Sequence, residues 1–213
     1  MVLAWALLLP LGMLTARYFK VTRSQNWPQN LDNKLWWRLH LALQVSGVLA
    51  MTIGLGLVWL STGKAAFGHS LHSTLGWLVV GLGWMQLIGG YLRGSKGGPV
   101  KLPDGRIDLA RAQRGDHYNM SRRRVAFEWI HKLGGYAALV LSVLVTALGL
   151  TRAQAPAWMW VVIGLWWCVL CAIAWRLQVA GRCLDTYQAI WGPDPRHPGN
   201  LRRPIGFGIR RES

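Results

Sequence analysis

Five long apolar stretches limit what this chain can fold into. They are Val2–Ala16, Trp36–Leu60, Leu71–Leu92, Val125–Leu150 and Ala157–Val179. Four of them reach the roughly 20 residues that an α-helix needs to cross the hydrocarbon core of a bilayer. Backbone polar groups inside lipid must be satisfied within the protein, so such stretches fold as helices that pack on one another. The sequence therefore predicts an all-α integral membrane bundle of five transmembrane helices.

The first stretch is shorter than the others. Val2–Ala16 has 15 residues before Arg17, or about 23 Å of helix at 1.5 Å per residue. It lacks the basic start and the small-residue cleavage site of a signal peptide, and Pro10 near its middle predicts a kink. We expect a membrane helix without its first turns, because either the chain begins at an internal methionine or another chain completes this end.

The basic residues predict the orientation of the bundle. The chain has a formal net charge of +16, and most of this charge lies in the segments after the first and third stretches and after the last. The loops on the opposite side hold only Lys64 and Arg152. Short basic loops stay in the cytoplasm, so we expect the N-terminus outside and the C-terminus inside. The charge is then a signal of membrane topology, and we expect no nucleic-acid partner.

The cytoplasmic segments differ from the membrane domain in composition. We assign residues 1–180 to a transmembrane domain and residues 181–213 to a basic cytoplasmic tail. The tail is rich in Pro, Gly and Arg and contains Trp191. This composition predicts an extended arm that orders against a partner, or a disordered segment near anionic lipid. His117 and His197 lie in polar cytoplasmic segments, so we expect both to be exposed.

The cysteines carry little information. Cys168 and Cys171 form a C-x-x-C pattern inside the last apolar stretch. This pattern can bind a metal or form a redox pair, but in an apolar helix without a second pair it is more typical of packing.

Three histidines lie near the ends of apolar stretches, where a polar ring needs a partner. His40 and His131 stand near the cytoplasmic starts of the second and fourth stretches. These two stretches cross the membrane in the same direction, so the two rings reach similar depths. His72 stands near the outer start of the third stretch, and its partner would come from the outer start of the first. His69 shares a helix with His72 and could not reach the opposite side of a cofactor.

Glycines follow these histidines along the same helix faces. The relevant positions are Gly47 and Gly54 after His40, Gly76, Gly83 and Gly90 after His72, and Gly134 and Gly135 after His131. Small residues admit a neighbouring helix or a flat macrocycle, and the glycines alone do not decide between them. Paired imidazoles in a bundle core favour haem, because zinc needs more ligands close together. We therefore predict that Gly47, Gly76 and Gly135 contact haem.

Four short motifs on successive stretches resemble the cytochrome b561 domain. They are "AWALLLPLGMLTARYFK", "HLALQVSG", "HSTLGW" and "HKLGGY", in this order. The resemblance covers residues 1–150 and implies a four-helix haem-binding core, with the fifth helix behind it. It suggests a bacterial inner-membrane member of the family without an attached donor-binding domain.

The resemblance implies two b-type haems, each held by histidines from alternate helices. His40 and His131 would be the axial ligands of the cytoplasmic-side haem iron, and His72 would be one ligand of the outer haem iron. The remaining ligand of the family would fall just upstream of Met1. We therefore expect one or two haems in this chain.

The resemblance also implies transmembrane transfer of single electrons, so the chain, if an enzyme, is a membrane oxidoreductase. Two axial histidines leave no open position for oxygen, which suits electron transfer. Arg38, Lys132 and the triplet Arg122–Arg124 are near enough in sequence to the histidines to meet haem propionates, or they contact lipid headgroups. The donor or acceptor would be a small molecule or a protein, and its identity is left open.

A structural role is the alternative. The short first helix and the basic tail fit a structural or assembly subunit that uses a degenerate b561-like bundle as part of a larger membrane complex.

Overall fold

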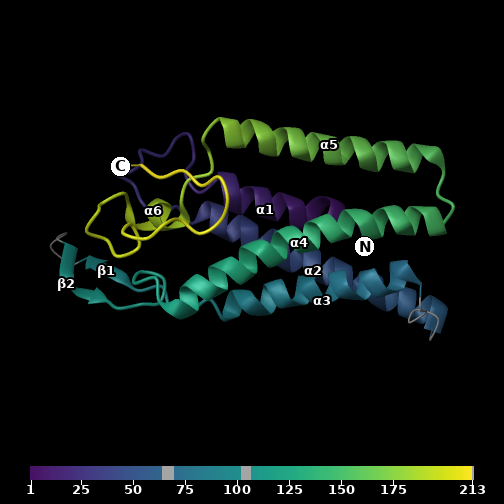
Figure 1. Cartoon of the computed structure of the whole chain (residues 1–213), viewed down its shortest axis with the longest axis horizontal. Helices are drawn as coiled ribbons and strands as arrows, with labels where there is room; N and C mark the ends of the chain where they lie inside the picture. The colour runs from purple at the N-terminus through teal and green to yellow at the C-terminus, as the bar shows by residue number, and fades with distance from the viewer. Residues whose placement is uncertain (64–69, 102–106, 213) are drawn as a thin grey trace.

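The computed structural model of the chain is a bundle of long helices with a small globular region at one end (Figure 1). The structure describes residues 1–63, 70–101 and 107–212. The elements in chain order are the π-helix η1 (Leu3–Leu8), α1 (Leu9–Tyr18), α2 (Leu35–Thr62), α3 (Leu71–Tyr91), β1 (Gly98–Lys101), β2 (Ile107–Gln113), α4 (Arg122–Arg152), α5 (Ala157–Val179) and α6 (Thr186–Trp191).

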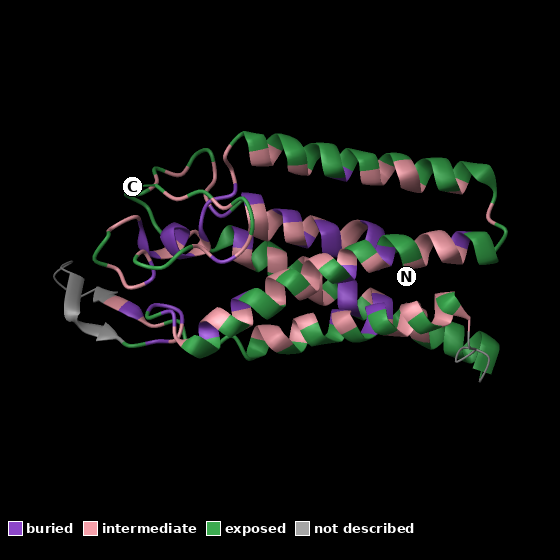
Figure 2. Cartoon of the chain, viewed as in Figure 1, coloured by how far each residue is buried: buried purple, intermediate pink, exposed green. Residues whose placement is uncertain are grey.

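The prediction of a helical membrane bundle is confirmed. Among the described residues, four helices are long and apolar enough to cross a membrane, namely α2 to α5, and Leu3–Tyr18 is a shorter apolar helix. Burial follows this assignment, because the outward faces of the helices are exposed along most of their length (Figure 2). Large apolar side chains such as Leu60 and Trp175 lie on these faces, as expected where lipid replaces water.

The segments rich in basic residues meet at one end of the bundle. Figure 1 shows the segment after α1, the β1–β2 hairpin, α6 and the C-terminus together there, with the α4–α5 connection at the other end. The hairpin is antiparallel, and it pairs Gly98 with Gln113 and Lys101 with Ile107. The sequence analysis did not anticipate these strands.

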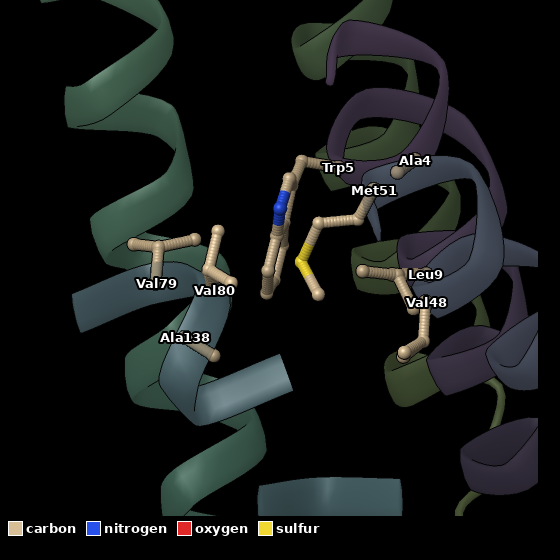
Figure 3. Close-up of a cluster of buried hydrophobic side chains, with 8 residues drawn as sticks. All are labelled: Ala4, Trp5, Leu9, Val48, Met51, Val79, Val80 and Ala138. Atoms are coloured by element: carbon tan, nitrogen blue, oxygen red, sulfur yellow. The ribbon is translucent and has the colours of Figure 1, made fainter. Parts of the chain in front are cut away.

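A buried cluster joins η1 and α1 to α2, α3 and α4. Its members are Ala4, Trp5, Leu9, Val48, Met51, Val79, Val80 and Ala138. Figure 3 shows the Trp5 and Met51 side chains between the residues of α3 and α4 on one side and those of α1 and α2 on the other. A Cβ atom at Gly83 would lie 3.1 Å from Met51 Cε, so a glycine there leaves room for this core.

The first helix changes its winding where the sequence predicts a kink. Leu9 N donates to Ala4 O, five residues earlier, and α1 begins at Leu9 with Pro10 in its first turn. Because proline has no N–H, it cannot donate to the carbonyl of Ala6, four residues before it. Trp166 Nε1 of α5 donates to that same Ala6 oxygen at 2.6 Å. The proline therefore leaves free the acceptor that attaches α5 to the first helix.

The C-terminal segment is not the extended or disordered arm that its composition predicts. Arg210 N donates to Cys183 O, and Asp185 N donates to Arg210 O, so its two ends lie side by side. Tyr187 is 2% exposed, and its hydroxyl donates to Tyr118 O at 2.8 Å. Tyr118, Met120, Tyr187, Trp191 and Ile205 form a second buried cluster. Aromatic burial of this kind is what a composition-based prediction of disorder misses.

Trp166→Phe should lower the free energy of unfolding by about 1–3 kcal/mol, because it leaves the Ala6 carbonyl without a donor. In a Pro10→Ala background, the new backbone N–H of residue 10 can donate to Ala6 O. Trp166→Phe should therefore lower the free energy of unfolding less in this background. Unfolding in mixed detergent gives the free energy of unfolding of the unsubstituted chain, the two single variants and the double variant. Equal losses in both backgrounds would contradict this account of α5.

Candidate haem site

The described residues enclose a cavity of about 710 Å³ between the helices, near the end that carries the basic segments. Trp5, Leu9 and Val48 form its apolar part, and His40 and His131 face it from α2 and α4. Residues of the C-terminal segment line the wall toward the globular end, among them Cys183, Thr186, Ile190, Gly206 and Ile209. A cavity of this size suits a bound organic group rather than a single ion.

The structure brings His40 and His131 together, as the sequence predicts. Their ring centroids are 6.4 Å apart, and the ring planes are nearly perpendicular at 85°. A metal ion bound by two imidazoles on opposite sides, at about 2 Å per bond, places their ring centres about 6 Å apart. The pair therefore fits the axial ligands of one iron.

The hydrogen bond of His40 leaves the correct ring nitrogen free for a metal. His40 Nδ1 lies 2.9 Å from Gly12 O of α1. A carbonyl only accepts, so Nδ1 must carry the hydrogen and Nε2 keeps its lone pair. Ligating histidines usually have such a partner on the second nitrogen. A Cβ atom at Gly12 would lie 2.4 Å from Gln44 Nε2, so glycine permits this approach of α1 to α2.

His131 has a different partner. The side-chain amide of Gln86 on α3 lies 2.8 Å from His131 Nδ1, and Phe127 stacks on the ring at 5.1 Å between centroids. The sequence analysis did not select Gln86. Its signal was the single side-chain amide in the apolar stretch Leu71–Leu92.

His72 lies apart from this pair and does not line the cavity. Its Nδ1 is 3.1 Å from Val145 O of α4, which again leaves Nε2 free for a metal. A Cβ atom at Gly149 would lie 3.0 Å from the His72 ring. His69 lies outside the described residues.

The three glycines predicted at the cofactor have different surroundings. Gly135 lines the cavity. Gly47 packs against α1, because a Cβ atom there would lie 2.6 Å from Leu9 Cδ2. A Cβ atom at Gly76 would meet nothing within 4 Å. The seven-residue spacing thus identifies a helix face without identifying what covers it.

The predicted basic residues also differ in whether they line the cavity. Lys132 lines the cavity, and its Nζ donates to Glu128 Oε2 at 2.8 Å and to Ile205 O at 2.7 Å. Arg38 is exposed and does not line the cavity. Of the triplet, Arg124 is buried and its Nε donates to Glu128 Oε1 at 3.0 Å, whereas the two arginines before it are exposed.

Lys20 is a buried cation at the cavity that the sequence analysis missed. Its side chain lines the cavity, and its Nζ donates to Arg17 O and Leu184 O, both at 3.0 Å. Burial lowers the pKa of Lys20 to about 8. Together with Lys132 and Arg17, it gives this end of the cavity a positive potential that suits carboxylates.

His117 is buried, contrary to the expectation that it is exposed. It is 6% exposed, its ring lies 4.4 Å from that of Trp191, and Nε2 is 3.7 Å from Glu128 Oε1. Burial, and then the charge of Arg124, lower the pKa of His117 to about 3. The reason for its burial is the C-terminal segment, which supplies Trp191.

The two cysteines of α5 lie on its exposed surface. Cys168 and Cys171 are free and exposed on a helix that faces lipid over most of its surface. Within the described residues, no three His, Cys, Asp or Glu side chains form a group that could hold a metal ion.

Acidification should destabilise the protein through His117. The unfolded chain protonates this ring near pH 6.5 and the folded chain only near pH 3. The free energy of unfolding therefore falls as the pH drops from 6.5 toward 3, by about 2 kcal/mol between pH 7 and pH 5. The cations Arg124, Arg93 and Lys132 disfavour the proton, and Glu128 favours it.

His117→Phe should remove this part of the pH dependence. Thermal unfolding in detergent at pH 7 and pH 5 measures the effect in both chains. The same acid-induced loss in the variant as in the unsubstituted chain would show that another group is responsible.

Comparisons with known proteins find similarity to cytochrome b561 proteins. The family model described as eukaryotic cytochrome b561 matches residues 1–93. A cytochrome b561, DM13 and DOMON domain-containing protein of Arabidopsis thaliana is 27% identical over 150 residues, which are 70% of this chain and 14% of that protein. A second Arabidopsis protein, with cytochrome b561 and DOMON domains, is 27% identical over 173 residues, 81% of this chain and 30% of that protein.

An animal relative is also similar. A Drosophila melanogaster protein named as a ferric-chelate reductase 1 homolog is 29% identical over 168 residues, 76% of this chain and 22% of that protein. The chain therefore spans less than a third of the length of each of these relatives. No solved structure matches the chain at a significant level.

These matches show that the chain is similar to proteins with a cytochrome b561 domain. The matching relatives come from a plant and an insect, and the family model is a eukaryotic one. They give no support to the bacterial origin that the sequence analysis expected.

Proposed function

We propose that this chain carries single electrons across a membrane, with His40 and His131 holding one b-type haem in the cavity. The observation that carries the proposal is the facing pair of rings, 6.4 Å apart. When bound, the haem supplies one-electron exchange between ferric and ferrous iron, and two axial histidines leave no position for oxygen.

The residues around the pair prepare the site for this group. The Gly12 carbonyl and the Gln86 amide hold the two rings from behind. Trp5, Leu9 and Val48 form an apolar wall of the cavity that His40 and His131 line. Low polarity there lessens the rearrangement of surrounding dipoles when the charge on the site changes.

The charged end of the cavity has a separate role in the proposal. Lys20 and Lys132 lie at this end and would face the carboxylates of the haem. The basic surface beyond them, including Arg93 and Lys96, would attract an anionic donor or acceptor. We propose that this end faces the cytoplasm, with the N-terminus outside, because short basic loops stay inside. A bacterial inner membrane remains an expectation of the sequence analysis alone.

His72 would serve a second haem toward the opposite face, with its ring oriented by Val145 O. The proposal therefore allows one or two haems per chain. The reductant or acceptor would be a small molecule, such as a ferric chelate, or another membrane redox protein, and the chain would act by itself or within a larger membrane complex.

The difference spectrum of the purified chain, dithionite-reduced minus oxidised, tests the function, with a pyridine haemochrome count per polypeptide. We expect b-type bands and one or two haems. No haem in a folded chain would contradict the electron-transfer proposal and leave the structural or assembly role.

Single substitutions test the assignment of ligands. His40→Ala and His131→Ala should each remove the same haem, because one iron needs both rings, and the count should fall by one in each variant. His72→Ala should remove a different haem or none. His197→Ala, outside the cavity, is the control. Full haem content in both His40→Ala and His131→Ala would show that the pairing is wrong.

A further inference from the structure

The three candidate ligands differ in what holds their second ring nitrogen. His40 and His72 each face a main-chain carbonyl, Gly12 O and Val145 O, at 2.9 and 3.1 Å. A carbonyl only accepts a hydrogen bond, so these rings have one fixed tautomer. His131 faces the Gln86 amide, which can donate or accept depending on its orientation.

The surroundings of Gln86 favour one orientation. With the amide turned to suit them, its nitrogen donates to His131 O at 2.9 Å and to His131 Nδ1 at 2.8 Å, and its oxygen accepts from Gly135 N at 3.2 Å. In this orientation Nδ1 accepts, so the hydrogen of the ring lies on Nε2, the nitrogen that faces a metal. The bonds to His131 O and Gly135 N therefore favour the tautomer that does not bind metal.

The amide can also turn. His131 and Gly135 are four residues apart on α4, the spacing of a helical hydrogen bond, so the two backbone groups can satisfy each other. A turned amide then presents its oxygen to Nδ1, which carries the hydrogen when Nε2 binds iron.

The sequence of α4 provides space for the amide. A Cβ atom at Gly134 would lie 2.5 Å from the Gln86 amide. At this distance the amide would have to move, so any residue larger than glycine displaces it. Gly134 thus admits a side chain of α3, while Gly135 lines the cavity.

We propose that Gln86 is a positioning residue for His131, and that its amide sets the tautomer and the ligand strength of that ring. This inference rests on the proposed haem site. His40 would then have a partner of fixed orientation, the Gly12 carbonyl. The partner of His131, the Gln86 amide, would turn when Nε2 of His131 binds iron. A stronger acceptor at Nδ1 makes the imidazole more basic and favours ferric iron.

The haem midpoint potential in the full chain tests the proposal. Gln86→Glu places a carboxylate at Nδ1 and should lower the potential. Gln86→Leu removes the acceptor and should raise it. Gln154→Leu is the matched control, because Gln154 is exposed in the α4–α5 connection and does not line the cavity. It should leave the potential unchanged.

Haem retention gives a second result from the same variants. Loss of the haem in Gln86→Leu but not in Gln86→Glu also supports the proposal, because only the acceptor distinguishes them. Shifts of the same sign, no shift in either variant, or loss of haem in both would overturn it.

Gly134→Ala should act like Gln86→Leu, because it displaces the amide. Gly81→Ala, on α3, adds a Cβ atom in open space and should have no effect on the potential. Equal potentials in the two alanine variants would contradict the role given to Gly134.

Nuclear magnetic resonance of the haem-free chain separates this proposal from the proposed function. Ring-¹⁵N-labelled His131, assigned by its loss in His131→Gln, should carry its hydrogen on Nε2 and should become a tautomer mixture in Gln86→Leu. If the unsubstituted chain binds no haem, the proposed function fails and this measurement still decides the role of Gln86. An unchanged tautomer in Gln86→Leu would overturn it.

Discussion

The bundle depends on the requirement that every polar group inside lipid finds a partner within the protein. The ring nitrogens of His40 and His72 meet this requirement with main-chain carbonyls from neighbouring helices, and the Ala6 carbonyl meets it with an indole from α5. Each of these bonds joins two helices, so the same interactions that satisfy polar groups also fix the helix arrangement. The orientation of the candidate ligands is thus a consequence of how the bundle is held together.

The apolar stretches and the paired histidines are the parts of this structure that the sequence predicts. Long apolar runs have one solution in lipid, so α2 to α5 follow from composition and length. His40 and His131 stand near the starts of helices that run in the same direction, which predicts similar depths without knowledge of packing, and their ring centroids lie 6.4 Å apart. The direction of a helix and the depth of a residue can be read from the order of the chain.

The parts that the sequence does not predict depend on which helix faces which. Gly47 and Gly135 look alike in the sequence, but one meets Leu9 and the other the cavity. Gln86 contacts His131 only because α3 and α4 pack together. His117 is buried because Trp191, over 70 residues later in the chain, packs against it. Composition also underestimates the C-terminal segment, whose Tyr187 and Trp191 lie in one buried cluster.

The cavity wall combines parts of the chain that lie far apart in the sequence. Gly206 and Ile209 line that wall, and they follow the four long apolar helices α2 to α5 in the chain. Gly206 lies against Lys132, and Gly208 O accepts from Gln178 Nε2 of α5. A group held between His40 and His131 would therefore be kept in place on this side by a segment outside the membrane helices, so a change in the packing of that segment would alter how firmly the cavity holds it.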